Sequence, residues 1–442
     1  MISTFTVRFA FAMLGFVVSQ QAFASGYEKS IMWGGRSAGF AGIATPYTSG
    51  ADALYFNPAG IVADKTGQEV SFNISPVSSQ FKGPINNQND EATSATNLST
   101  PFGLIYGNTV NEQWGFAVGG YVSGGSKVSY EDITFTGVPA GMDVKTDVQF
   151  LELALGAAYK VNDKLKLGAS LRNTYSSGEF GFVQRLGNQG ALGYSVLNAK
   201  LTGLKDTKPG FGLGAQYQLD EKTRLGLRYR SEVKIEASGT LEGNLHTAGP
   251  GASGSTIPVT PASGTAETTF PQALTLGAQH QLNEMWTLLA EYGWTNYSKV
   301  DVITLKGVIA TTTTGTIANG SAVQQYWQDQ HNYRLAAQYG TDVDWPVRFG
   351  YGYTSQVTNE AYARAAFTPP AVAHTLTVGT GRELSIGEKP LRFDSGLEYT
   401  FASGDGNPNG STSASAGGGG DFRKGTFATS SYALHLGLAY MF

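Results

Sequence analysis

The chain lacks cysteine and is poor in charged residues. Its 442 residues include no Cys, and only 14% are Asp, Glu, Lys or Arg. The absence of cysteine excludes disulfides, thiol chemistry and the lipidated N-terminal cysteine of a lipoprotein. A soluble protein of this size carries nearer a quarter charged residues, so something other than water covers much of this surface. The net charge of −4 gives no reason to expect nucleic-acid binding.

Long apolar runs are also missing. The sequence has no stretch of about 20 apolar residues, so we expect no transmembrane helix in the mature chain. A shorter apolar run from Phe9 to Val18 follows the single basic residue Arg8 and precedes a small-residue site at residues 22–24. This order is typical of a secretory signal peptide. We therefore expect a signal peptide over residues 1–24 and an exported chain that starts near Ser25.

Alternation of apolar and polar residues dominates what is present. From residue 68 onward, segments of roughly 10 to 20 residues alternate in this way, which is the pattern of strands with one apolar face. In the last segment, every second residue from Tyr432 to Phe442 is apolar. The charged and small residues lie on the opposite face, as expected for a membrane barrel with lipid outside and a polar lumen. A terminal phenylalanine on such a strand resembles the signal read by the outer-membrane insertion machinery.

The connections between these segments alternate between short and long, as in membrane barrels of the bacterial outer membrane. Tight turns are expected at residues 108–112, 162–164, 220–222, 283–284, 341–345 and 387–389. Long polar loops are expected near residues 82–98, 125–144, 188–196, 246–263, 307–323, 358–371 and 404–428. Seven loops and six turns predict an all-β membrane protein. We predict a fourteen-stranded antiparallel transmembrane β-barrel over residues 68–442, placed in the bacterial outer membrane.

The segment at residues 25–67 does not alternate and is rich in Gly, Ser and Ala. Small residues allow tight backbone packing, and Asn57-Pro58 favours a helix start or a turn because the proline ring pre-sets the backbone angle. A lumen of fourteen strands is too wide for the barrel's own side chains to fill. We therefore expect this segment to be an N-terminal hatch that plugs the lumen.

A family resemblance rests on this segment. The run Asp52-Ala-Leu-Tyr-Phe-Asn-Pro-Ala-Gly60 and the early Ser25-Gly26-Tyr27 resemble the FadL-type family of outer-membrane transporters for long-chain fatty acids and aromatic hydrocarbons. Weaker matches occur at residues 286–299, 327–335 and 345–351. The resemblance covers nearly the whole mature chain. It implies that substrate enters from outside, moves to a pocket against the hatch, and leaves sideways through a gap at an inward kink of the third strand.

The resemblance and the residue pattern together give three sets of candidate residues. The hatch motif is Asn57, Pro58, Ala59 and Gly60. The candidate ligand contacts are Gly26, Tyr27, Phe56, Trp327 and Arg334, with Arg334 as the partner of a substrate carboxylate. The candidate lateral opening is the third strand, with Gly115, Gly119, Gly120 and Gly124. Alternatives remain open: hatch core packing for the aromatic residues, an internally paired lumen for the arginine, and relief of twist for the glycines.

The predicted function is passive, ligand-gated transport of fatty acids or hydrocarbons by a monomer, in contact with outer-membrane lipid and lipopolysaccharide. No enzyme activity, cofactor or metal is expected, because the five histidines show no ligand spacing. The match of residues 35–39 to a nucleophile elbow lacks the flanking strand and helix that expose the serine. The alternatives are a general porin or surface-structure barrel, and an outer-membrane lipid hydrolase with a serine and a histidine close in space.

Deletion of residues 25–60 distinguishes a general porin from a ligand-gated transporter. Loss of the plug leaves a porin open or opens it further, whereas it removes the binding step of a ligand-gated transporter. We expect the deletion to abolish saturable uptake of a labelled hydrophobic compound by cells. Uptake that remains saturable in the deletion variant would contradict the hatch assignment.

Overall fold

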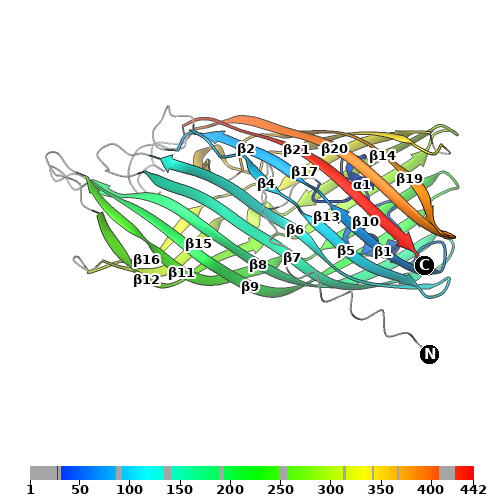
Figure 1. The fold of residues 1–442 in the computed structure, drawn as a ribbon, viewed down its shortest axis with the longest axis horizontal. Coiled ribbons are helices and arrows are strands. Elements are labelled where there is room, and N and C mark those ends of the chain that lie inside the picture. The colour runs from blue at the N-terminus through cyan, green and yellow to red at the C-terminus, as the bar shows by residue number, and fades with distance from the viewer. Residues whose placement is uncertain are drawn as a thin grey trace.

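The computed structural model describes residues 27, 31–85, 92–133, 141–188, 194–248, 256–311, 315–340, 343–365, 368–407 and 424–442. The signal peptide predicted at residues 1–24 and the candidate contact Gly26 lie outside these described residues. Within them, no helix has the length and apolar character needed to cross a membrane. The strands wrap into one elongated barrel that encloses the N-terminal helices (Figure 1).

The wall is a closed ring of fourteen strands, several of which are interrupted. The first six are formed by β1 (Gly67–Ile74) with β2 (Val77–Gly83), β4 (Asn97–Ser99) with β5 (Phe102–Thr109), β6 (Trp114–Ile133), β7 (Met142–Lys160), β8 (Leu165–Asn188) and β9 (Tyr194–Gln218). The next four are β10 (Thr223–Arg230) with β11 (Val233–Ala248), β12 (Thr256–Phe270) with β13 (Ala273–Gln281), β14 (Trp286–Thr295) with β15 (Val302–Thr311), and β16 (Gly315–Gln324) with β17 (Gln330–Tyr339). The last four are β18 (Val347–Thr354), β19 (Ala373–Ile386), β20 (Lys389–Gly406) and β21 (Gly425–Met441).

Every neighbouring pair in the ring is antiparallel, and β1 closes the ring by pairing with β21, with Val70 opposite Tyr440. The predicted fourteen-stranded barrel is therefore confirmed. A short strand, β3 (Ala92–Thr93), adds to the outer end of β2. The remaining elements are short helices: α1 (Gly35–Ala38), α2 (Ala53–Phe56) and η1 (Pro58–Ile61) in the hatch, and η3 (Tyr297–Lys299) and η4 (Glu360–Tyr362) between strands.

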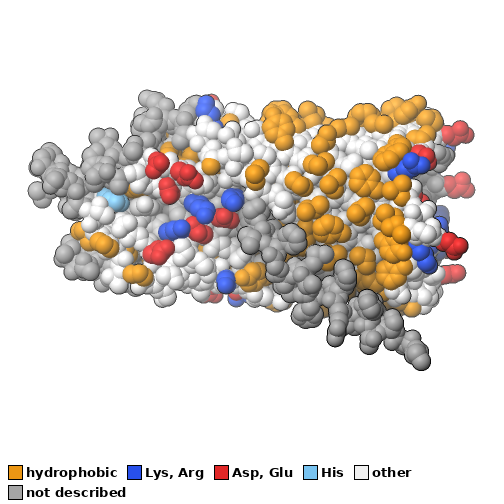
Figure 2. All heavy atoms as spheres, in the orientation of Figure 1, with side chains coloured by type: hydrophobic (Ala, Val, Ile, Leu, Met, Phe, Trp, Pro, Cys, Tyr) orange, Lys and Arg blue, Asp and Glu red, His pale blue; other side chains and the backbone are white. Residues whose placement is uncertain are grey.

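Side chains alternate across the wall as the sequence pattern predicts. On β21, Tyr432 and Leu434 are exposed on the outside, while Ala433 and His435 are buried on the inside. Apolar side chains gather over the half of the barrel nearest the C terminus, and charged side chains lie beyond them toward the opposite end (Figure 2). The apolar zone is where lipid covers a membrane barrel.

The predicted long loops are wrong in extent. The strand β6 continues to Ile133, β12 begins at Thr256 and β16 covers Gly315–Gln324, although these residues fall in loops predicted at 125–144, 246–263 and 307–323. Beyond the apolar zone, both faces of a strand can be polar, so the backbone ladder continues after the alternation has ended. Four predicted tight turns do join adjacent strands, each with an Asn or Asp side chain that accepts a backbone N–H: Asn111, Asn162, Asp220 and Asn283.

Inward-facing glycines hold the hatch against the wall. A Cβ at Gly226 would overlap the carbonyl of Thr45, and a Cβ at Gly350 would lie 2.5 Å from the backbone nitrogen of Ala41. The same close approach to hatch atoms recurs at Gly107, Gly115, Gly168, Gly214, Gly277, Gly379, Gly396 and Gly437. We call this set the glycine ring. Because these residues have no side chain, the hatch backbone packs directly on the strand backbone.

The glycine ring predicts that one methyl group displaces the hatch. Gly226→Ala places a Cβ against Thr45 and 2.7 Å from the Cα of Pro46, an overpacking that costs about 1–3 kcal/mol. We expect the barrel to remain folded but to show higher conductance in planar bilayers and faster proteolysis of the hatch. The matched control is Gly293→Ala, whose added Cβ lies 3.6 Å from its nearest neighbour. Equal behaviour of the two variants would contradict the model of direct backbone contact.

Candidate functional site

The predicted hatch motif fastens the hatch to itself and to the wall. The Asn57 side chain donates to the carbonyl of Thr45 at 2.8 Å and to the carbonyl of Ala215 on β9 at 3.1 Å. Its oxygen accepts the backbone N–H of Ala59, and Pro58 occupies the first turn of η1. Gly60 packs on the Thr48 carbonyl, where no Cβ fits. All four motif residues are buried.

Buried ion pairs form further anchors. Arg334 donates to Glu291 at 2.8 Å, and the other oxygen of Glu291 accepts the backbone N–H groups of Ala44 and Thr45 in the hatch. Arg334 is thus committed to a carboxylate of the barrel itself.

A second group of ion pairs lies on β18 and β20, where Asp394 pairs with Arg348 at 2.6 Å and with Arg392 at 3.1 Å. Arg392 also lies 3.8 Å from the carboxylate of Asp52 in the hatch. Burial raises the pKa of Asp52, and the Arg392 guanidinium opposes that rise. The hatch is therefore held by charge as well as by backbone contact.

The third strand, β6, stops pairing with the second strand after Tyr121. Its pairing with β5 runs from Gly115 to Tyr121, where Tyr121 lies opposite Gly103. A β-bulge at Ser123 follows in the pairing with β7. Among the described residues, the next backbone hydrogen bond to the second strand's chain joins Ala95 and Ser129. We call the interval between Tyr121 and Ser129 the wall window.

Two hatch residues, Tyr27 and Trp33, bond to the third strand at this window. The carbonyl of Tyr27 accepts the backbone N–H of Gly125 at 2.9 Å, and the indole N–H of Trp33 donates to the carbonyl of Val122 at 3.0 Å. Backbone groups that lose a strand partner are thereby satisfied by the hatch. Satisfaction of this kind is required of buried backbone groups in general.

The four predicted glycines of the third strand have different surroundings. Gly115 lies against the Ile61 carbonyl of the hatch, and Gly119 lies against the backbone of β5. Gly124 stands at the window, where an added Cβ would lie 2.7 Å from the Tyr27 carbonyl oxygen. At Gly120 an added Cβ would come closest to the end of the Leu153 side chain, at 3.1 Å, with the Glu152 carbonyl oxygen at 3.7 Å. Close approach of backbone atoms therefore explains the need for glycine at Gly115, Gly119 and Gly124.

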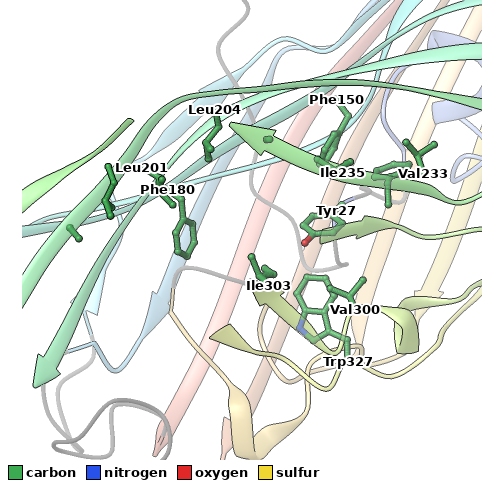
Figure 3. Close-up of a cluster of buried hydrophobic side chains, with 14 of the residues drawn as sticks. Tyr27, Phe150, Phe180, Leu201, Leu204, Val233, Ile235, Val300, Ile303 and Trp327 are labelled. Carbon is green, nitrogen blue, oxygen red and sulfur yellow. The ribbon is translucent and has the colours of Figure 1, made fainter. Parts of the chain in front are cut away.

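An apolar pocket lies in the lumen beside the window. Tyr27 stands at its centre, with its ring 5.6 Å from Phe150 and 5.3 Å from Trp327, centroid to centroid. Figure 3 shows Tyr27 surrounded by Phe150, Ile235, Ile303 and Trp327 from separate strands and connections. The Tyr27 hydroxyl contacts the Thr268 hydroxyl at 2.6 Å, and its backbone N–H donates to the hydroxyl of Tyr297. The structure thus brings the candidates Tyr27 and Trp327 together.

The candidates Phe56 and Arg334 line a second, polar cavity between hatch and wall. The side chains of Arg228, Arg230 and Glu291 also line this polar cavity. Phe56 packs against Trp33 there, with ring centroids 5.1 Å apart. The predicted contacts are therefore divided between two cavities.

Sequence reasoning did not select Phe150, Phe180, Phe270 or Ile235, which also build the apolar pocket and its core. A usable signal exists for Phe150. It lies on the inward register of β7, two residues before inward Glu152, where an aromatic residue breaks the polar pattern. Apolar residues on a nominally polar face indicate a site for a hydrophobic ligand.

A serine and a histidine do meet in the wall. The Ser75 hydroxyl lies 2.8 Å from Nδ1 of His435, whose Nε2 lies 2.9 Å from Glu398. All three side chains are buried, and Ser75 and His435 are 0% exposed. Together they join β20 and β21 to the break between β1 and β2, where Ser75 precedes Pro76. Ser37, the serine of the elbow-like motif, donates to the Gly34 carbonyl. Within the described residues, no cluster of His, Asp or Glu could hold a metal ion.

A family model described as outer membrane protein transport protein (OMPP1/FadL/TodX) matches residues 15–442. The chain belongs to this family. Its members are transport proteins of the bacterial outer membrane, so this FadL-family chain is an outer-membrane transporter of hydrophobic compounds and not an enzyme. The resemblance stated from the hatch motif is thereby confirmed.

Individual relatives are more distant. A long-chain fatty acid transport protein of Escherichia coli O6:H1 is 24% identical over 339 residues, or 69% of this chain and 67% of that protein. Outer membrane protein P1 of Haemophilus influenzae is 27% identical over 45% of this chain and 46% of its own length. The chain thus spans about half of that second relative. The crystal structure of the P. putida toluene transporter TodX superposes with a TM-score of 0.69 at 19% identity, covering 94% of this chain and 98% of that one, which shows a shared fold.

The bonds of Asn57 predict a strong effect of a small change. Asn57→Asp keeps the acceptor for Ala59 but removes both donations, so the Thr45 and Ala215 carbonyls face a carboxylate. Leaving a buried group unsatisfied costs about 1–3 kcal/mol. We expect earlier proteolysis of the hatch and weaker ligand binding, while the barrel itself still migrates as a folded band on gels before heating. A hatch as resistant to protease as that of the wild type would contradict this role of Asn57.

Proposed function

We propose that hydrophobic small molecules pass inward by passive, ligand-gated diffusion and leave sideways through the wall window into the membrane. One observation carries this proposal: Tyr27 belongs to both the pocket and the window. Its ring lies among the aromatic side chains of the pocket, and its carbonyl accepts the N–H of Gly125 on the third strand. A ligand that occupies the pocket competes with the Tyr27 ring and thereby acts on the residue that closes the wall.

The gate depends on a few bonds. Withdrawal of Tyr27 breaks its hydrogen bonds to Gly125, Tyr297 and Thr268, each of which contributes about 0.5–1.5 kcal/mol. A ligand shifts such an equilibrium only by its differential affinity for the two states. Burial of an apolar ligand among the pocket's aromatic rings supplies an affinity of the required size. Energy coupling is therefore not needed.

The sideways direction follows from what surrounds the window. The hatch occupies the lumen on the side of the pocket that faces the glycine ring. It packs against those glycines and is held by the ion pairs of Glu291 and Asp394. The two strands that flank the window carry exposed apolar side chains on the outer face: Leu98 and Leu104 on the second strand, and Phe116 and Val118 on the third. An apolar compound that leaves through the window enters hydrocarbon rather than water, which is its favoured environment.

The general porin remains the second candidate function. It requires an open aqueous path, whereas the described hatch residues contact glycines on most of the strands, and the two cavities described above are small. This arrangement favours a plugged transporter.

Deletion of Ser123 tests the window. Ser123 is the extra residue of the bulge, since Val122 pairs with Leu151 and Gly124 pairs with Phe150. Its removal leaves these two pairs consecutive, so the third strand becomes regular and able to pair with the second. We expect uptake to fall at least tenfold while binding of the ligand to purified protein changes little.

The matched control is Ser123→Ala, which keeps the bulge and loses one hydroxyl contact to the Phe150 carbonyl. We expect it to transport at a rate close to that of the wild type. Unchanged uptake in the deletion variant, in barrels that are folded by gel mobility, would exclude this route.

A further inference from the structure

The walls of the apolar pocket carry no formal charge. The described residues that line it include aliphatic and aromatic side chains, with no Asp, Glu, Lys, Arg or His among them. Besides the indole N–H of Trp327, its polar groups are hydroxyls, among them those of Ser126, Thr146, Ser176, Ser177, Thr268 and Thr368. A hydroxyl can accept or donate a single hydrogen bond to a ligand, but it cannot neutralise a carboxylate.

The one ionisable group in the lining is the phenol of Tyr27. Burial raises the pKa of Tyr27 above its ordinary value, against the opposing effect of its hydrogen bond to Thr268. The phenol is therefore neutral at pH 7. None of the described residues of the pocket wall supplies a counter-charge.

Cations near the pocket are committed to other partners. Arg230 donates to Glu152 and lies over the ring of Phe270, with its guanidinium carbon 4.7 Å from the ring centroid. Arg172 donates to the same Glu152 at 2.7 Å and to the carbonyls of Phe211 and Ser231. Removing a carboxylate from water without a cationic partner is strongly unfavourable. Among the described residues that line this pocket, a fatty-acid anion would find no cationic partner.

Size and shape agree with this electrostatic argument. The pocket has a volume of about 70 Å³ in this closed form, smaller than the roughly 150 Å³ of an engineered cavity that binds benzene. Displacement of the Tyr27 ring makes room for one further ring. The remaining Phe150, Phe270 and Trp327 offer the edge and face contacts that aromatic molecules prefer.

We infer that this pocket selects a small neutral aromatic compound over a fatty-acid anion. The inference rests on the proposed function and narrows its substrate class. It also sets this chain apart from those relatives that are named for the transport of long-chain fatty acids.

Toluene and benzoate test the inference, since they share a ring and differ in charge. Equilibrium dialysis of labelled ligand against full-length protein in detergent gives the dissociation constants. At pH 7, we expect benzoate to bind at least 100-fold more weakly than toluene. Below the pKa of free benzoic acid, its binding should approach that of toluene, whose own affinity at both pH values controls for changes in the protein.

A charge placed in the wall should invert the preference. Thr146 is buried, and its hydroxyl has no hydrogen-bond partner among the described residues. We expect Thr146→Lys to weaken toluene binding and strengthen benzoate binding, each at least tenfold. Ser385→Lys adds the same charge at an exposed position near a turn and should leave both affinities unchanged. Because Thr146→Lys can fail to fold, Phe150→Ala is a second test, expected to weaken toluene binding at least tenfold.

Three results would overturn the inference, and they differ in what else they affect. Equal binding of benzoate and toluene at pH 7 would show that charge does not select at this pocket. Binding of labelled laurate, but not toluene, would reassign the substrate to fatty acids and keep transport intact. Binding of none of the three, with uptake by cells unaffected by loss of the protein, would remove the proposed function as well.

Discussion

Direct contact between the hatch backbone and the wall backbone is the constraint on which the rest of the structure depends. A ring of fourteen strands encloses more space than its own inward side chains can fill. Here the inward positions at hatch level are largely glycine, so the wall makes the space wider still and the hatch fills it. The position of Tyr27, and with it the pocket and the window, follows from how the rest of the hatch is held.

Charge in the lumen supports the same contact. A buried carboxylate is stable only with cations or hydrogen-bond donors around it, and Glu291 obtains these from Arg334 and from two N–H groups of the hatch. Arg334 therefore fastens the plug in this structure. The pocket beside the window keeps aromatic rings and hydroxyls, so fastening and binding are carried out by different kinds of side chain.

Much of the fold could be predicted because it obeys a period of two. The outward Tyr432 and Leu434 and the inward His435 follow from alternation alone, and the polar turns fix the number of strands. The strand ends could not be predicted, since residues such as those from Gly125 to Ile133 continue a ladder after the apolar face has ended. The site was only partly predictable. Tyr27 and Trp327 were found from the hatch and the resemblance, but their contact with Phe150 and Phe270 depends on which strands lie across the lumen, and a single sequence does not encode that distance in any local pattern.

The closing pair of the ring bears on how the barrel is made. The seam joins β1 to β21, so the first and the last strand of the ring complete the wall. The hatch leads directly into β1, and glycines of β19, β20 and β21 pack against it at Gly379, Gly396 and Gly437. Because β21 both closes the seam and packs on the hatch at Gly437, closing the ring and seating the plug depend on each other.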